Sequence, residues 1–207
     1  DIIKRPINEV LARQELQQVI DTEKDPNPKD VEELIPKIFP LGGVVLVLQN
    51  LLREQVPIRD LLTILETLAD WSPATKDLDI LTEHVRHALA RTITRMHLTP
   101  EGNIAAITLG HSLESAISDA LQQTDHGSFL SLDPSVAQQM MNNLSASLEK
   151  MSSLNHQPVV MCSAQIRYHV KRLIDRFMPH IAVLSYDEIL SKVEIQSLDM
   201  LELNHAD

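Results

Sequence analysis

The stretch VLQNLLREQVPIRDLLTILETLADW, residues 47–71, holds two leucine-rich patterns separated by Val56 and Pro57. Before the break, apolar residues recur at helical spacing, at Val44, Leu48, Leu51 and Leu52. A residue before proline favours an extended conformation and proline suits the first turn of a helix, so Pro57 is expected to begin a second helix. That helix has a wide apolar face made by Ile58, Leu61, Leu62, Ile64, Leu65 and Leu68. The stretch therefore predicts two helices packed as a hairpin.

Charged residues flank the break, with Arg53 and Glu54 before it and Arg59 and Asp60 after it. A DNA-binding helix-turn-helix would need cations facing phosphates and arginine or amide side chains facing bases. The second helix has Arg59 as its only basic residue, and its acidic residues are Asp60, Glu66 and Asp70. Its charge argues against DNA binding, and the charges of the hairpin are expected to face outward.

Helices are also predicted on both sides of the hairpin. A third helix, capped by Asp77 or Asp79, would direct a line of apolar residues inward, namely Leu81, Val85, Leu89, Ile93 and Met96. Residues 2–20 and 31–38 predict two earlier helices, joined by the charged, proline-bearing loop 21–30. Residues 30–97 therefore predict an all-helical domain.

Beyond residue 99 the apolar pattern changes from helical spacing to short buried runs. Strands are predicted at 104–109, 158–162, 181–185 and 193–198, and helices at 113–123, 134–151 and 164–178. The order strand, helix, strand over 158–185 is a βαβ unit and implies parallel pairing. The predicted fold is mainly α, with a small mixed α/β domain at its C-terminal end.

Composition limits the possible partners. The 207 residues are 43% hydrophobic but only 3% aromatic, which is typical of a globular chain with an aliphatic core and gives little surface for base stacking. The net charge is −11, with 12 basic and 16 acidic residues in 1–100 and 6 basic and 13 acidic residues in 101–207. This charge disfavours binding to nucleic acid and to anionic membranes.

The chain ends and the single cysteine give weaker indications. Cys162 is the only cysteine, so no intrachain disulfide is expected and a reducing compartment is favoured. The longest apolar run, residues 41–48, is too short for a membrane span, and residues 1–4 do not resemble a signal peptide. The first residue is Asp1 rather than Met, so the chain is expected to be part of a longer protein.

Two residues could act as nucleophiles in a hydrolase. Ser112 follows a predicted strand in the segment GHSLE, where a nucleophile elbow would lie, but Glu114 replaces the glycine that this turn needs. Helix capping by Ser112 is the favoured interpretation. Cys162 has His156 and His169 near it in sequence without any motif spacing, and a buried structural thiol is favoured.

Metal and phosphate sites are not predicted. His84 and His87 share one helical face, but no cysteine or carboxylate completes a ligand set, so a solvated helix face is expected. Gly42 and Gly43 precede two valines rather than the Lys-Ser/Thr pair of a phosphate-binding loop. No metal and no cofactor is expected.

Two charged surfaces could bind partners. On the third helix four residues follow at four-residue spacing, Glu83, His87, Arg91 and Arg95, while the second helix offers Asp60, Glu66 and Asp70. These surfaces could pair head to tail between copies and build a ring, although solvated surface charge is an equally good explanation. Residues 165–177 form a basic helix that could bind an acidic partner through Arg167, Lys171, Arg172 and Arg176.

Four sequence blocks, taken in order, resemble the cytoplasmic domain of the type III secretion export gate family. They are LIPKIFPL…VLQNLLREQVPIRDLLTILETLAD (34–70), LTEHVRHALARTI (81–93), PVVMCSAQIRYHVKRLIDRFMPHIAVLSYDEI (158–189) and VEIQSL (193–198). The resemblance runs from about residue 11 to residue 198, nearly the whole chain. LSYDEI together with VEIQSL is more similar to the virulence branch of the family than to the flagellar branch.

The resemblance implies a non-enzymatic inner-membrane protein whose membrane part lies outside this chain. Its cytoplasmic part would form a nonameric ring below the export channel. Its partners would be its own copies, the stalk of the secretion ATPase, chaperone–substrate complexes and the gatekeeper. Residues 1–24 would be the last helix of an upstream subdomain with a linker, 25–98 the helical ring-forming subdomain, and 99–207 the α/β subdomain.

Overall fold

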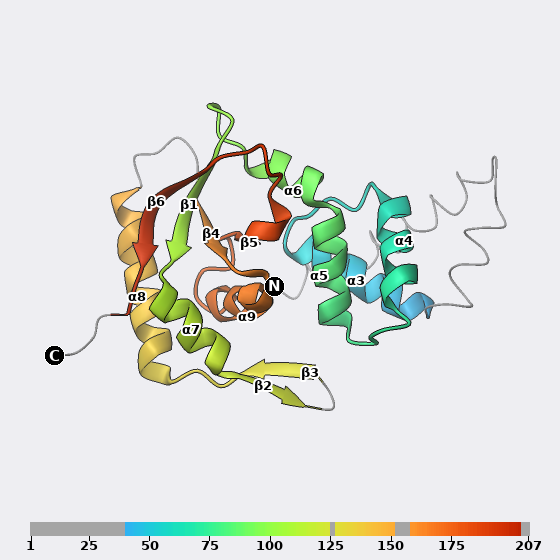
Figure 1. Cartoon of the computed structure of the whole chain (residues 1–207), viewed down its shortest axis with the longest axis horizontal. Coiled ribbons are helices and arrows are strands. Elements are labelled where there is room, and N and C mark those ends of the chain that lie inside the picture. The colour runs from blue at the N-terminus through green and yellow to red at the C-terminus, as the bar shows by residue number, and fades with distance from the viewer. Residues whose placement is uncertain (1–39, 125–126, 152–157, 204–207) are drawn as a thin grey trace. The chain divides into compact units, whose positions relative to one another are not determined.

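The computed structural model describes residues 40–124, 127–151 and 158–203 (Figure 1). The chain divides into two compact units, the first ending at Ile93 and the second beginning at Thr94. The first is helical and the second is mixed α/β, which confirms the predicted fold class. The predicted helices at 2–20 and 31–38 and the predicted boundary at 24–25 lie outside the described residues. The predicted boundary at 98–99 stays a prediction.

The first unit contains the two predicted leucine-rich helices, but each packs mainly against the helix that follows them, so the prediction that they pack as a hairpin is wrong. Its helices are α3 (Leu41–Arg53), α4 (Leu61–Trp71) and α5 (Leu78–Ala88), and α6 (Ala90–His97) crosses into the second unit. The prediction that Pro57 begins the second helix is wrong, because α4 begins at Leu61. Asp60 is its N-cap, and the Asp60 side chain accepts a hydrogen bond from Thr63 N (3.3 Å).

The turn after α3 ends that helix without glycine. Gln55 has a left-handed backbone, with φ at 62°. Val56 N donates to Leu51 O (2.9 Å) and Gln55 N donates to Leu52 O (3.0 Å), which is the Schellman pattern of a helix C-terminus. This turn ends α3 and separates the two leucine patterns.

Apolar side chains from α3, α4, α5, the start of α6 and the loop between α3 and α4 form the core of the first unit. Its buried members are Val44, Val45, Val47, Leu48, Leu51, Val56, Ile58, Leu61, Ile64, Leu65, Leu68, Leu81, Val85, Leu89 and Ile93. Two predicted core positions are wrong, since Leu62 is 54% exposed and Met96 is 41% exposed. Asn50 Nδ2 donates to Thr82 Oγ1 (3.2 Å) and links α3 to α5.

The predicted third helix is two helices. Asp77 caps α5 by accepting hydrogen bonds from Asp79 N and Ile80 N, so the cap is Asp77 rather than Asp79. The helix ends at Leu89, its C-cap residue, and α6 begins at Ala90. The break contains neither glycine nor proline, so the even apolar spacing of this segment concealed it.

The second unit is built on a four-stranded parallel sheet. Its strands are β1 (Ile104–Leu109), β4 (Val159–Cys162), β5 (Val183–Ser185) and β6 (Ile195–Leu201), in the spatial order β5-β4-β1-β6. Strands β4 and β5 pair in parallel, and helix α9 (Ala164–Asp175) connects them, which confirms the predicted βαβ unit. A short 3-10 turn, η1 (Tyr186–Glu188), follows β5.

A β-hairpin replaces part of a predicted helix. Helix α7 (His111–Asp119) ends early, and β2 (Leu121–Thr124) then pairs antiparallel with β3 (Gly127–Leu130). Helix α8 (Pro134–Lys150) follows, capped by Asp133, whose carboxylate accepts from Ser135 N (2.7 Å). The predicted start of this helix at Asp133-Pro134 is therefore confirmed.

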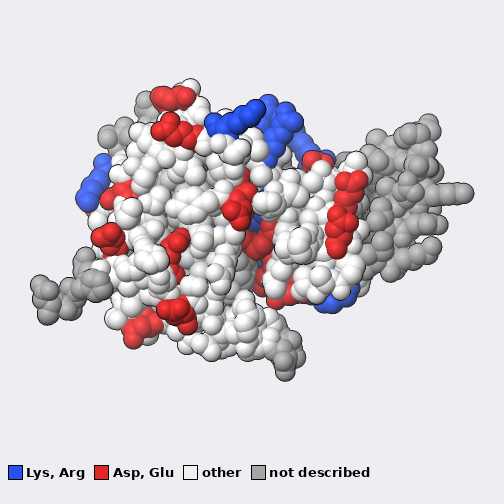
Figure 2. Space-filling view, in the orientation of Figure 1, with Lys and Arg blue, Asp and Glu red and all other residues white. Residues whose placement is uncertain are grey.

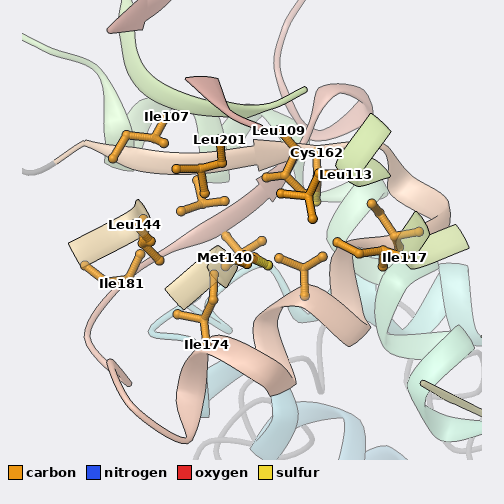
Figure 3. Packing of buried hydrophobic residues seen from close by; sticks show 14 of the residues in the cluster. Ile107, Leu109, Leu113, Ile117, Met140, Leu144, Cys162, Ile174, Ile181 and Leu201 are labelled. Carbon is orange, nitrogen blue, oxygen red and sulfur yellow. The ribbon is translucent and has the colours of Figure 1, made fainter. Parts of the chain in front are cut away.

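The core of the second unit lies between the sheet and its helices (Figure 3). All six residues of β1 are buried, as expected for a central parallel strand. The core side chains come from the strands and from α7, α8 and α9: Ile107, Leu109, Leu113, Ile117, Met140, Met141, Leu144, Val160, Cys162, Ile166, Val170, Ile174, Ile181, Val183 and Leu201. Met140, Leu144 and Ile174 show in Figure 3 how helical side chains meet those of the strands.

Candidate functional site

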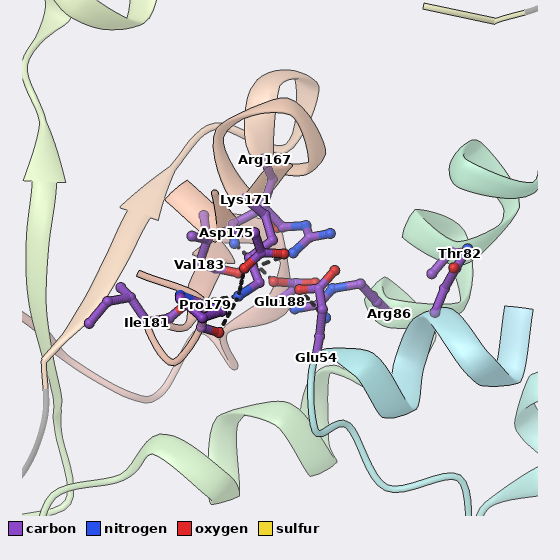
Figure 4. A network of polar contacts seen from close by, with 12 residues as sticks. Glu54, Thr82, Arg86, Arg167, Lys171, Asp175, Pro179, Ile181, Val183 and Glu188 are labelled. Carbon is purple, nitrogen blue, oxygen red and sulfur yellow. Dashed lines mark hydrogen bonds and ion pairs between the residues drawn. The ribbon is translucent and has the colours of Figure 1, made fainter. Parts of the chain in front are cut away.

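Helix α9 contains the predicted basic surface, but two of its four basic residues are buried. Arg167 is fully buried, and its Nη1 donates to Val183 O (3.1 Å) on β5 (Figure 4). Lys171 is 5% exposed. The prediction that Arg167 and Lys171 face a partner is therefore wrong, because both side chains are directed into the α/β unit.

The two buried cations stabilise the connection from α9 to β5. Lys171 Nζ donates to Ile181 O (2.9 Å) and Pro179 O (3.3 Å), and it lies 2.7 Å from Asp175 Oδ1 (Figure 4). Buried charges need such partners, because an unpaired charge in an apolar interior is costly. A carbonyl-rich turn after α9 thus explains why this helix contains cations on its inner side.

Arg172 of α9 and Arg176, the C-cap residue of this helix, are exposed and lie one helical turn apart. Arg172 Nη1 donates to Tyr168 OH (3.2 Å), and its guanidinium carbon lies 5.6 Å from the centroid of the Tyr168 ring. This contact is a cation–π arrangement, and it restricts the Arg172 side chain without removing it from solvent. These two residues remain candidates for partner binding.

Both arginines line a groove of about 410 Å³ within the second unit. One wall is α9 and the turn that follows it, where Leu173 and Phe177 join the two arginines. The β-hairpin of β2 and β3, with the loop after it, forms the opposite wall. Helix α8 contributes the remaining side chains. The complete lining is Phe129, Leu130, Leu132, Pro134, Ala137, Gln138, Met141, His169, Arg172, Leu173, Arg176 and Phe177.

One polar contact joins the hairpin to α9 beside this groove. Ser128 Oγ lies 3.0 Å from His169 Nε2, and the His169 ring also meets the Tyr168 ring edge to face at 5.2 Å. The sequence did not reveal this wall, because residues 121–123 were predicted to be helical. The exposed Phe129 was the one available signal, since an aromatic residue in a polar segment is unusual for a surface without a partner.

Two of the three acidic residues predicted to form a surface on the second helix lie together on α4. Glu66 and Asp70 are exposed and lie one turn apart on α4, where Figure 2 shows a column of acidic side chains. Asp60 precedes the helix and caps it through Thr63 N. Asp60 therefore has a structural role, and Glu66 and Asp70 form the acidic surface.

The predicted basic surface is divided by the break at Leu89. Glu83 and His87 lie on α5, whereas Arg91 and Arg95 lie on α6. The prediction of one continuous four-residue face is therefore wrong. His87, Arg91 and Arg95 are exposed, Glu83 is half-buried, and Figure 2 shows basic side chains gathered over α6. Arg91 and Arg95, one turn apart, form the basic surface.

Ser112 is placed as a helical residue rather than as an activated nucleophile. Helix α7 begins at His111 with Gly110 as N-cap, so the prediction that Ser112 caps the helix is wrong. A Cβ on Gly110 would lie 2.9 Å from Glu202 Cγ and 3.1 Å from Leu201 O, so the end of β6 leaves little room for a side chain at this position. Glu114 Oε1 accepts a hydrogen bond from Ser163 N (2.8 Å), which gives Glu114 a capping role at the start of α9.

Cys162 is fully buried at the end of β4, and its sulfur lies 3.9 Å from Leu184 O. Partial burial first, and then the neighbouring Glu114 and Cys162, raise the pKa of Tyr186 above its usual value. His156, one proposed base for Cys162, lies outside the described residues. The burial of Cys162 fits the interpretation of a structural thiol.

His84 differs from its prediction as a solvated side chain. Its ring stacks on Trp71 with centroids 3.6 Å apart and planes 9° from parallel. Burial and the neighbouring His87 lower the pKa of His84 below its usual value. Within 40–124, 127–151 and 158–203, no three His, Cys, Asp or Glu side chains are grouped as a metal site would need.

No helix among the described residues is both long and apolar enough to cross a membrane. The arrangement contains a groove and two charged surfaces, and these features suit binding to other protein surfaces.

Known proteins resemble this chain over nearly its whole length. It is 38% identical over 201 residues to the flagellar biosynthesis protein FlhA of Bacillus subtilis, which covers 97% of this chain and 30% of that protein. This chain thus spans less than a third of that relative.

Two solved structures have the same fold. One is the complex of the CdsV and CdsO proteins of Chlamydia pneumoniae, with 32% identity, a TM-score of 0.81 and coverage of 91% of this chain and 55% of that one. The other is the nonameric EscV cytosolic domain from the type III secretion system, with 30% identity, a TM-score of 0.68 and the same coverage of both chains.

The family model described as the FHIPEP family matches residues 1–194. Because this match covers all but the last 13 of the 207 residues, the chain belongs to the FHIPEP family, the export gate family that its sequence resembles.

Proposed function

We propose that this chain is the C-terminal region of the cytoplasmic part of a type III secretion export gate, and that it acts as a non-enzymatic scaffold in a nonameric ring. The observation that carries this proposal is the family match over residues 1–194. The nonameric state of the EscV cytosolic domain supports the ring. The scaffold would lie at the cytoplasmic face of a bacterial inner membrane, attached to a membrane part outside this chain.

The ring would receive other components of the secretion apparatus. The CdsV and CdsO complex supports a second protein partner, which we assign to the stalk of the secretion ATPase. Chaperone–substrate complexes and the gatekeeper are further partners, proposed from the family resemblance. The segments 184–189 and 193–198 support the virulence branch of the family over the flagellar branch.

The two exposed charged surfaces provide a way to build the ring. Glu66 and Asp70 of one copy would face Arg91 and Arg95 of the next, since each pair lies one turn apart on its helix. An interface between two different surfaces of identical chains is heterologous and closes into a ring when its rotation is suitable. Charge complementarity of this kind mainly sets register and partner choice.

Sedimentation velocity tests this assignment, with concentrations from micromolar to near-millimolar. We expect the wild-type chain to shift toward large species, and Arg91→Glu with Arg95→Glu to weaken that association at least tenfold. The matched control is Lys150→Glu with Lys192→Glu, which changes the net charge equally at two other exposed positions and should leave association unchanged.

A quadruple variant that exchanges the charges of both surfaces makes the test specific. Adding Glu66→Arg and Asp70→Arg to the arginine reversal restores opposite charges across the interface and should restore association. If the arginine reversal has no effect, or if the exchange fails to rescue it, the assigned interface is wrong. If the wild-type chain stays monomeric at every concentration, the proposal that this chain forms ring contacts by itself is wrong.

A further inference from the structure

The groove between the hairpin, α8 and α9 has an apolar interior and exposed aromatic edges. The chain has only three phenylalanines, and two of them line this groove. Phe129 is 50% exposed and Phe177 is 60% exposed, on opposite walls. Aromatic side chains left in solvent at the edge of an apolar depression are typical of protein-binding surfaces.

The floor of the groove continues the core of the unit. Met141 is 4% exposed, and Leu130 and Leu173 are partly buried against the same core cluster. A bulky apolar side chain entering the groove would therefore contact a packed apolar surface. The hydrogen bond between Ser128 and His169 connects the hairpin wall to α9, so the groove is largely formed before a partner arrives.

Charge distinguishes this groove from the rest of the unit. Residues 101–207 carry 6 basic and 13 acidic residues, yet among the residues that the structure describes no acidic side chain lines the groove. Of the six basic residues, Arg167 and Lys171 are buried, and two of the four exposed ones, Arg172 and Arg176, line the groove. The groove is thus a locally basic site on an acidic surface, and it favours an acidic partner.

The spacing of the arginines indicates the form of that partner. Arg172 and Arg176 are one turn apart on α9, so their side chains can pair with two carboxylates one turn apart on a second helix. We propose that this groove binds an amphipathic helix of another protein, which carries Asp or Glu at i and i+4 beside a Leu or Phe that enters between Phe129 and Phe177. The inference deepens the proposed function, because it gives the chemistry of one partner of the export gate.

Selection from a displayed library tests the proposal with the whole chain. The probe is a library of helical peptides of about 16 residues, long enough to hold a helix, with varied residues on one face. We expect the enriched peptides to carry an acidic pair at i and i+4 next to Leu or Phe. A synthetic peptide from the enriched set, labelled with fluorescein, then serves for anisotropy titrations.

Matched variants connect the binding to the groove. Arg172→Glu with Arg176→Glu should weaken the peptide at least tenfold, and Phe177→Ala should weaken it at least fivefold. Lys150→Glu with Lys192→Glu supplies the same charge change, and Met200→Ala removes another exposed apolar side chain, at 51% exposure. Both controls should bind within twofold of the wild-type chain.

Several results would overturn the proposal. No enrichment, enriched peptides without the acidic pair, or equal loss in the groove and control variants would each exclude this partner chemistry. Sedimentation velocity of the groove variants separates this question from ring formation, and we expect unchanged self-association. If they lose self-association instead, the groove is an interface between copies, and the helix proposal is wrong while the ring proposal stands.

Discussion

Arg86 Nη1 on α5 lies 3.1 Å from Glu54 Oε2, the carboxylate that follows α3. The side chain of Arg86 is 2% exposed and that of Glu54 is 13% exposed, so the contact is a largely buried ion pair (Figure 4). Glu54 belongs to the stretch whose charges were expected to face outward, and for this residue that expectation is wrong. The pair joins the end of α3 to α5, the helix against which α3 packs.

Removing one partner of this pair should destabilise the first unit. Glu54→Ala leaves the Arg86 guanidinium in a buried position with less compensation, and we expect a loss of about 3 kcal/mol in unfolding free energy. Urea unfolding followed by the fluorescence of Trp71, the single tryptophan, measures this loss within the first unit.

Two further variants separate charge burial from other effects. Glu66→Ala removes an exposed carboxylate from α4 and should change stability by less than about 0.5 kcal/mol. Glu54→Leu with Arg86→Met removes both charges and should recover much of the loss. If Glu54→Ala and Glu66→Ala have the same effect, the buried ion pair contributes little to stability.

The left-handed residue at the end of α3 gives a prediction of opposite sign. Gln55 has φ at 62°, a conformation that glycine adopts without steric cost. Gln55→Gly should therefore stabilise the first unit by about 0.5–1 kcal/mol, after the added freedom of the unfolded chain is offset.

The same substitution within the helix is the control. Gln49→Gly lies inside α3 and should destabilise the unit by about 1 kcal/mol. Trp71 fluorescence in urea measures both changes. Equal signs for Gln49→Gly and Gln55→Gly would contradict the assigned turn geometry.

The parts of the fold that could be predicted are those with local signals. Buried runs such as residues 104–109 and the Asp133-Pro134 start of α8 identify themselves by composition and capping. The β-hairpin formed by β2 and β3 could not be predicted from the sequence. Leu113, Ile117 and Leu121 continue a helical spacing beyond residue 119, where α7 ends. Its strands are short and mostly polar, so local sequence gave no strand signal.

The candidate site was only half predictable for a different reason. Four cations on residues 165–177 predict a charged face, yet Arg167 and Lys171 find carbonyl acceptors on β5 and on the loop before it. No sequence pattern around α9 identifies those acceptors. Only the folded chain shows which cations donate to them. The remaining pair, Arg172 and Arg176, lines a groove. That groove could not be predicted, because one of its walls is the β-hairpin of β2 and β3.

The stack of His84 on Trp71 should make the stability of the first unit depend on pH. Burial first, and the neighbouring His87 second, lower the pKa of His84 in the folded state. The unfolded chain has a His pKa near 6.5 and takes up the proton first as the pH falls. Stability is therefore full above about pH 6.5 and decreases as the pH falls toward the folded-state pKa.

Proton NMR of the His84 ring measures the shift directly. Its titration midpoint should lie below that of the same residue in urea, and His87→Gln should raise the midpoint only in part, because burial remains. His84→Phe keeps an aromatic ring beside Trp71 and should reduce the loss of stability between pH 7.5 and pH 5.5. A His84 midpoint equal to that of the unfolded chain would contradict the partial burial of His84.

Cys162 provides a direct test of the hydrolase alternative. A catalytic thiol must be exposed and must have a lowered pKa, whereas Cys162 is fully buried in the sheet core. We expect a maleimide to label Cys162 at least a hundredfold more slowly in the native chain than in urea, since labelling requires the second unit to open. Mass spectrometry over time gives both rates.

An exposed thiol in the same unit calibrates the reagent. Ser191→Cys, made together with Cys162→Ala, places a single cysteine at an exposed position and should label at nearly the same rate in native and unfolded chains. If Cys162 in the native chain labels as fast as this control, the burial argument fails and a nucleophilic role returns as a candidate. Slow labelling agrees with a structural thiol, because a side chain that reagents reach only after opening cannot attack a substrate in the folded protein.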